Sequence, residues 1–89
     1  MSAPVSEMAH RYGPWAPELA PTERASRFRE LRALASLLLW REDAFLDLLH
    51  QASAGDVEAA DAAWYAMHEL PSRRVRRLLA SFAALEAPK

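Results

Sequence analysis

The chain has 89 residues, no cysteine and a formal net charge of −1. These features exclude a disulfide framework, a thiolate metal site and an overall charge that would hold the chain on nucleic acid or a membrane, and the length allows one small domain. The chain has 19 alanines and 13 leucines but only three valines and no isoleucine. Helices favour Ala and Leu, whereas strands favour β-branched residues. We therefore predict an all-α fold.

Residues 1–21 are predicted to form an extended, proline-rich arm in front of a helical bundle domain at residues 22–89. Four of the six prolines lie in this arm, at Pro4, Pro14, Pro17 and Pro21. Each proline disfavours helix for itself and for the residue before it. We expect Tyr12, Trp15 and Leu19 to dock residues 12–21 onto the helices, and we leave residues 1–11 open between a docked and a free segment.

Apolar residues recur at spacings of three, four and seven after Thr22, which predicts a helix with Thr22 as its N-cap. One helix reaching residue 53 would be roughly 46 Å long, which is long for so small a domain. We therefore favour a break near Arg41–Asp43, with Asp43 as the second N-cap. The predicted helices are about 23–40 and 43–53, and Gly55 is the expected stop.

Two further helices are predicted at about 57–70 and 73–86, with Asp56 and Ser72 as their N-caps and Pro71 between them. The first has the apolar stripe Val57, Ala60, Trp64, Met67 and Leu70. The second has the stripe Val75, Leu78, Leu79, Phe82 and Leu85. The complete prediction is a small bundle of three or four helices.

The segment Leu37–Trp40 is apolar around nearly the whole circumference of a helix, because successive residues point about 100° apart. Such a helix must be covered on every side. Either it is the central helix of a monomer, covered in part by the arm, or it presents an apolar patch to a second copy or another protein. In the second case the predicted interaction residues are Leu37, Leu39, Trp40 and Phe45.

A basic cluster opens the last predicted helix, with Arg73, Arg74, Arg76 and Arg77 in five positions. Positive charge opposes the helix dipole at this end, so we expect a negative group nearby. The charge of the chain is segregated: residues 42–71 carry seven acids and no Lys or Arg, between two basic segments. The arginines therefore either pair with acids of this chain or form a basic recognition surface.

The junction at Pro71 is also compatible with a helix-turn-helix, in which the four arginines would contact phosphates or guanine. The string Leu70-Pro71-Ser72-Arg73-Arg74-Val75-Arg76 resembles, over fewer than ten residues, the run that opens the promoter-reading region of bacterial sigma factors. No helix pair follows it in this sequence, so no function is inferred from the resemblance.

No catalytic constellation is found, and we predict neither a cofactor nor a metal ion. The histidines His10, His50 and His68 are scattered, and Asp47 with His50 is too small a set for a metal site. The only glycines, Gly13 and Gly55, form no phosphate-binding loop. We expect a non-enzymatic chain without catalytic residues.

The sequence thus indicates a small bacterial accessory or regulatory protein that binds another protein or a second copy of itself through helix faces. A DNA-binding regulator is the alternative. Ten arginines against one lysine, together with the many alanines, suggest a bacterial genome of high GC content. No signal peptide or membrane-spanning stretch is recognised, so a cytoplasmic location without membrane contact is expected.

Overall fold

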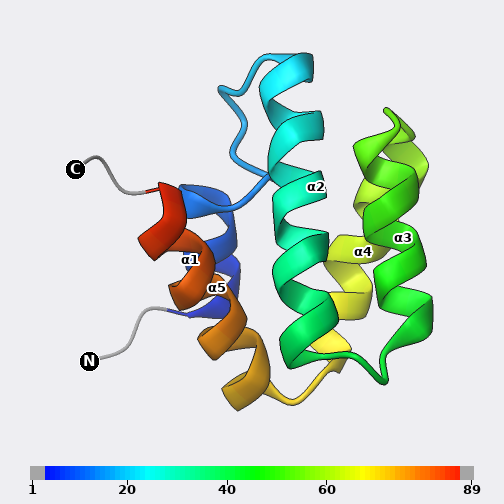
Figure 1. Cartoon of the computed structure of the whole chain (residues 1–89). Coiled ribbons are helices and arrows are strands. Elements are labelled where there is room, and N and C mark those ends of the chain that lie inside the picture. Colours follow the sequence, from blue (N-terminus) through cyan, green and yellow to red (C-terminus); the bar gives the residue numbers. More distant parts are fainter. Residues whose placement is uncertain (1–3, 87–89) are drawn as a thin grey trace.

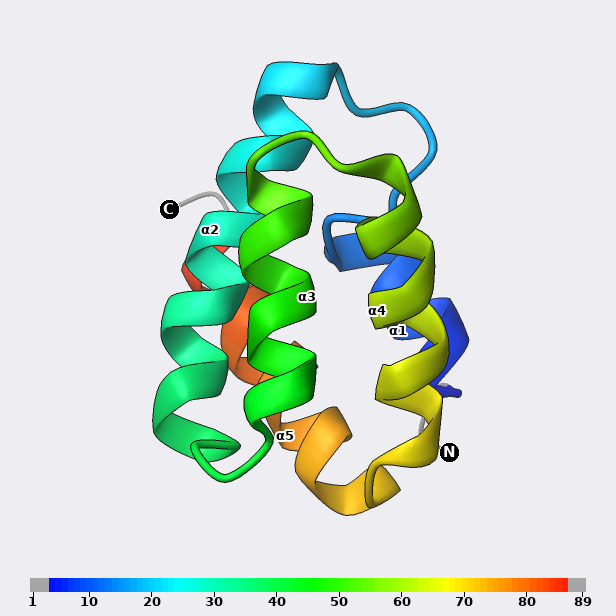
Figure 2. The same cartoon turned by 90° about the vertical axis from the view of Figure 1, so that its right-hand side faces the viewer.

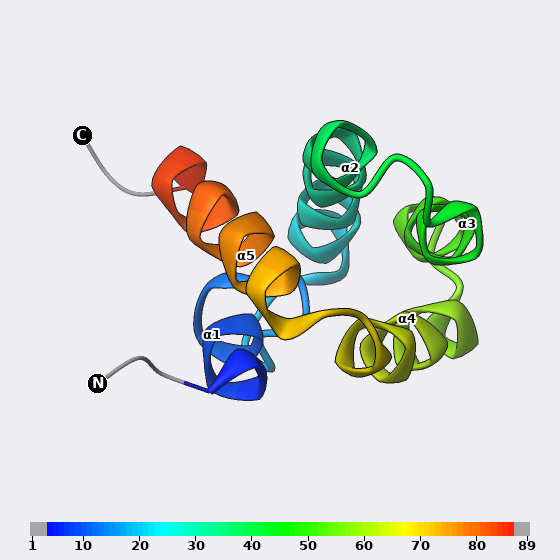
Figure 3. The ribbon, with the colours of Figure 1, turned by 90° about the horizontal axis from the view of Figure 1, so that it is seen from below.

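The computed structural model describes residues 4–86, which form five helices and no strand (Figure 1). The helices are α1 Val5–Tyr12, α2 Pro21–Leu38, α3 Asp43–Ser53, α4 Val57–Glu69 and α5 Ser72–Glu86. Helix α3 packs between α2 and α4, and α5 packs between α1 and α2. Seen along the bundle, the five helices surround one common core (Figure 3). The predicted all-α fold is confirmed, whereas the predicted number of helices was too small.

The extended arm is wrong for residues 5–12, which form helix α1. Pro4 takes the N-cap position, and its carbonyl oxygen accepts from the Met8 N–H at 3.0 Å. Ala9 is fully buried and faces the core together with helix α5. Prolines are tolerated at a helix start, where the missing N–H has no partner to lose. The prolines therefore mark the edges of α1 and do not prevent it.

The loop at residues 13–20 is docked, as predicted for the second half of the arm. The Trp15 Nε1–H donates to the Ala60 carbonyl oxygen of α4 at 2.9 Å, across 45 residues of sequence. Leu19 is half-buried, but Tyr12 is 42% exposed and contributes less to the docking than expected. Trp15 is therefore the main aromatic anchor of this loop.

The predicted break between α2 and α3 is confirmed. Helix α2 ends at Leu38, and the Glu42 N–H donates to the Leu39 carbonyl oxygen at 2.9 Å in the turn that follows. Both predicted caps here are wrong. Ala20 and Glu42 take the N-cap positions, and neither makes a side-chain hydrogen bond. Pro21 takes the first helical position and so starts α2 before Thr22. Asp43 is itself the first residue of α3.

The C-terminal end of α3 and the start of α4 follow the prediction. Gly55 has φ of +99° after α3, in the region that favours glycine. The Asp56 carboxylate accepts from the Ala59 N–H at 3.1 Å and so caps α4. Helix α5 begins at Ser72 itself, and the Pro71 carbonyl accepts from the N–H groups of the first turn. Pro71 therefore takes the N-cap position that was predicted for Ser72.

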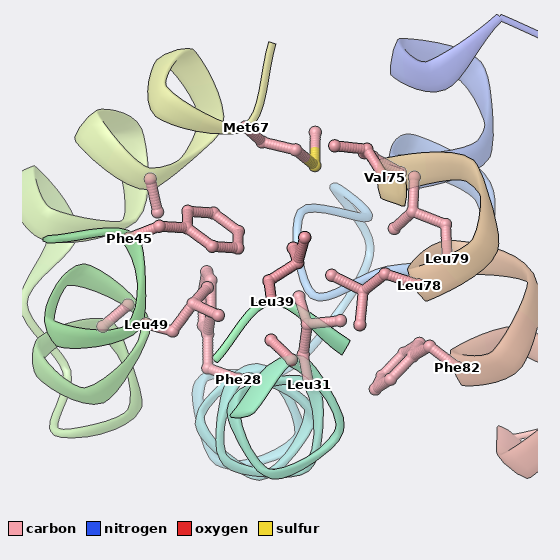
Figure 4. Packing of buried hydrophobic residues seen from close by; sticks show 14 of the residues in the cluster. Phe28, Leu31, Leu39, Phe45, Leu49, Met67, Val75, Leu78, Leu79 and Phe82 are labelled. Carbon is pink, nitrogen blue, oxygen red and sulfur yellow. The ribbon is translucent and has the colours of Figure 1, made fainter. Parts of the chain in front are cut away.

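Bulky side chains from α2, α3, α4 and α5 meet in the core (Figure 4). The predicted stripe of α5 is buried at Val75, Leu78, Leu79 and Phe82, while Leu85 is 65% exposed. The predicted stripe of α4 is rotated: the buried residues are Ala59, Ala63 and Met67, and Val57 is 73% exposed. Small alanines on the inner face let α4 approach the core closely. Trp64 is half-buried at the side of this inner face.

Candidate functional site

The predicted apolar interaction residues separate into two groups. Leu39 and Phe45 are 2% and 3% exposed and belong to the core, so they are not available on the surface of this fold. Leu37 and Trp40 are 74% and 61% exposed. The apolar segment Leu37–Trp40 is thus partly buried, as expected for the central helix of a monomer. It is also partly exposed, as expected for an apolar interaction patch.

The predicted basic cluster also divides. Arg73, Arg74 and Arg77 are exposed, and their side chains make no hydrogen bond or ion pair with any other residue in the range 4–86. Arg76 is half-buried and is engaged with the rest of the chain. Internal pairing with the acidic segment therefore does not account for three of the four arginines within the described range.

Trp40 and the arginines come together at one end of the bundle. The turn between α2 and α3 and the start of α5 lie at the same end in two perpendicular views (Figures 1 and 2). A hollow of about 270 Å³ lies between them, lined by residues 38–42 and by Arg74. We call the surface formed by Trp40, Arg41, Arg73, Arg74 and Arg77 the arginine end.

The arginine end combines an aromatic ring with positive charge. The Arg41 guanidinium carbon lies 4.7 Å from the centre of the Trp40 ring, a cation–π distance. The start of α5 adds the partial positive charge of the helix dipole beside Arg73 and Arg74. Glu42, which is half-buried, is the carboxylate on the wall of the hollow. An anionic group with an apolar part would complement this surface.

Two arginines of α2 have a structural role that the sequence did not reveal. The Arg24 guanidinium donates to the carbonyl oxygens of Pro14 at 3.0 Å and Leu19 at 3.3 Å. Arg27 donates to the Tyr12 carbonyl oxygen at 3.2 Å. These bonds hold the loop after α1 against α2. Each of these arginines thus binds backbone carbonyl oxygens and not a carboxylate.

A second hollow lies where α2 starts and α3 turns into α4. These parts of the chain are at the opposite end of the bundle from the arginine end (Figure 2). The volume of this hollow is about 510 Å³, and its aromatic walls include Trp15, Phe28 and Trp64. The Trp15 ring meets the Phe28 and Trp64 rings edge to face, with centres 5.3 and 5.5 Å apart. We call this hollow the tryptophan groove.

The charged groups that line the tryptophan groove are Arg24, Asp56 and Asp61. His10 lines it as well, and its imidazole stacks on the Trp64 indole with centres 4.6 Å apart and planes 15° from parallel. Sequence reasoning missed this groove because its walls come from the loop at 13–20, α2 and α4. The signal that could have indicated it is a tryptophan inside a proline-rich segment, since a bulky aromatic there needs a distant partner.

Within residues 4–86, no group of three or more His, Asp or Glu side chains is arranged to hold a metal ion. No described helix is both long and apolar enough to cross a membrane. Asp47 and His50 are both exposed on α3.

Comparisons with known proteins yield no relative: no protein-family model matches the chain, and no curated protein or solved structure matches it significantly. The candidate sites therefore stand on their own geometry.

Proposed function

We propose that this chain is a non-enzymatic binding protein whose arginine end holds an acidic segment of a partner protein. The observation that carries the proposal is the hollow in which the exposed Trp40 meets Arg41 and Arg74. Arg74 and its neighbours Arg73 and Arg77 on α5 have no carboxylate partner in residues 4–86. Helix-face contact through this surface suits the accessory or regulatory role that the sequence suggests.

The two kinds of side chain serve different purposes in such an interface. Exposed ion pairs contribute only about 0–1 kcal/mol each, so the arginines mainly select an acidic partner and speed its association. A tryptophan buried at an interface commonly contributes about 2 kcal/mol or more. Trp40 is therefore the anchor of the proposed contact, and Leu37, exposed near the end of α2, offers a second apolar side chain.

A second copy of the chain is one partner that meets these requirements. Residues 42–71 carry seven acids and no Lys or Arg, and they form α3 and α4. The arginine end of one copy complements the acidic helices of another. A dimer formed in this way would dissociate as salt increases, because its exposed charge pairs are screened.

Duplex DNA is the alternative ligand, since the exposed arginines at the start of α5 favour phosphate contact. Two features weigh against it. Helix α5 packs chiefly on α1 and α2 rather than on α4, unlike the second helix of a helix-turn-helix. Glu69 is exposed in the last turn of α4, close to Pro71, and adds negative charge beside the arginines.

Photo-crosslinking in the native host tests the proposal. We expect p-benzoylphenylalanine at position 40 to crosslink to a protein, and the crosslink to disappear when Arg73→Glu and Arg74→Glu are added. The same group at position 65 is the control, because Tyr65 is 70% exposed on α4, away from the hollow that defines the arginine end.

A crosslink between two copies of the chain would identify the partner as the protein itself. Absence of any crosslink at position 40 would contradict the proposal. Binding of a DNA duplex whose affinity falls steeply between two salt concentrations would favour the alternative.

A further inference from the structure

We propose that the tryptophan groove is a binding site for a small organic cation with a flat aromatic body, such as an aromatic amine. This site is independent of the arginine end. Helix α2 connects the two, and its 18 residues place them roughly 27 Å apart at the usual helical rise.

The size of the groove suits a ligand of this class. Binding sites for small molecules usually enclose about 300–1,000 Å³ and are lined mainly by apolar and aromatic groups. The tryptophan groove has a volume of about 510 Å³. Small side chains keep it open, since Ala25 of α2 and Ala60 of α4 both line it. A leucine at either position would occupy that space.

The aromatic walls favour a flat ring. The imidazole of His10 already stacks on the Trp64 indole, nearly parallel to it and at the edge of the same groove. His10 is exposed, so this contact forms where water has access. The chain thus contains an example of a planar nitrogen ring that is stabilised against this indole.

The charges select a cation. Asp56 and Asp61 line the groove from the α4 side, and Arg24 lines it from α2. The Asp56 carboxylate already caps α4 by accepting from the Ala59 N–H, so Asp61 is the carboxylate that can meet a ligand. Two nitrogens of the Arg24 guanidinium already donate to the carbonyl oxygens of Pro14 and Leu19, so Arg24 is committed to the loop. Asp61 is exposed and makes no hydrogen bond or ion pair with the rest of residues 4–86.

A bound ammonium group would therefore be placed beside Asp61. Ionised carboxylates only accept hydrogen bonds, and an ammonium group supplies three donors. The faces of the tryptophan rings attract the same positive charge through their quadrupoles. Charge and aromatic surface therefore favour the same ligand, whereas the carboxylate of an aromatic acid would be repelled by Asp61.

The test compares two probes of similar shape and opposite charge, 2-phenylethylamine and 3-phenylpropionate, by NMR of ¹⁵N-labelled protein at pH 8. We expect the amine to shift the indole N–H signals of Trp15 and Trp64. Trp40 at the opposite end is the internal control, and its signal should stay in place. The amine should bind roughly five-fold or more tightly than the acid, as expected for one charge contact.

Two variants locate the binding. Asp61→Asn removes the charge with little change of shape and should reduce the affinity for the amine roughly five-fold, while Asp47→Asn on α3 should leave it unchanged. Ala60→Leu should abolish the shifts by filling the groove. If circular dichroism shows that Ala60→Leu does not fold, Ala25→Leu serves the same purpose from the α2 side.

Three results would each overturn the proposal. The first is equal or tighter binding of 3-phenylpropionate. The second is the absence of shifts at Trp15 and Trp64 when the amine is added, and the third is an unchanged affinity in Asp61→Asn. None of these results bears on the arginine end, whose test uses position 40.

Discussion

Arg73 and Arg74 lie in the first turn of α5, where the helix dipole is positive and an acid would be more stable. Neither arginine has a hydrogen bond or ion pair within residues 4–86 that would compensate. The two side chains thus cost a small amount of folding stability where they stand. Such a cost is typical of a surface kept for contact with a ligand or a partner.

We therefore predict that Arg73→Glu and Arg74→Glu together stabilise the folded chain by about 1 kcal/mol, because repulsion by the dipole becomes attraction. Urea unfolding followed by circular dichroism measures the change. Arg77→Glu, one turn further along α5, should have a smaller effect because the dipole acts mainly within the first turn. A clear loss of stability in the double variant would show that these arginines pair inside the protein.

Asp56 provides the opposite case, a charged residue whose position is fully explained by the fold. Its carboxylate accepts from the Ala59 N–H at 3.1 Å and also favours the positive end of α4. We predict that Asp56→Ala lowers the free energy of unfolding by about 1 kcal/mol. Asp61→Ala, in the same helix but without a cap, should change it by less than about 0.5 kcal/mol. Equal losses in both variants would remove the capping explanation.

At the scale of elements, the loop at residues 13–20 shows how α1 is attached to the bundle. Arg24 and Arg27 donate to carbonyl oxygens of the chain between Tyr12 and Leu19, and Trp15 donates to α4. Loop carbonyls that are partly shielded from water need such donors. The cationic side chains of α2 therefore stabilise a segment that has little regular structure of its own.

We predict that Arg24→Ala lowers the free energy of unfolding by about 1–3 kcal/mol, because two charge-assisted hydrogen bonds are lost. The tryptophan emission should shift to longer wavelength as Trp15 loosens. Arg29→Ala is the matched control on the same helix, since Arg29 is exposed and makes no hydrogen bond or ion pair within residues 4–86. Equal effects of the two variants would contradict the assigned role of Arg24.

Three elements could be predicted from the sequence because their signals are local. Asp56 and Gly55 bound α4 and α3 through backbone requirements that few residues satisfy, and the apolar spacing of α5 matches its buried face. Helix α1 was missed because the four prolines of residues 1–21 were taken to disfavour helix throughout that segment, although none of them lies within Val5–Tyr12. Pro4 and Pro14 flank an uninterrupted stretch, and a proline at a helix start is favourable.

The candidate sites were less predictable because they depend on contacts between distant residues. Leu39 and Trp40 are adjacent and equally apolar, yet the turn after α2 buries the first and exposes the second. The spacing of apolar residues in the sequence does not show which of these two side chains is buried. The tryptophan groove needs Trp15, α2 and α4 to be placed in space before its walls can be recognised.

For the whole molecule, α1 closes the bundle. Helix α5 packs on α1 and α2 and has little contact with α4, so its outer side depends on α1 for cover. Ala9 belongs to the core, and Val5 and Met8 pack against it. A domain of 89 residues has little stability to spare, so a helix of eight residues at the start of the chain can decide whether it folds cooperatively.

We predict that removal of residues 1–12 abolishes the cooperative thermal transition seen by near-UV circular dichroism, because one side of α5 is then exposed to water. Met8→Ala gives a graded test, with an expected loss of about 1–2 kcal/mol for a partly buried side chain. Glu7→Ala on the exposed side of α1 should change stability by less than about 0.5 kcal/mol. A truncated chain that still melts cooperatively at a similar temperature would mean that α2 to α5 form the domain alone and that α1 serves mainly to hold His10 at the tryptophan groove.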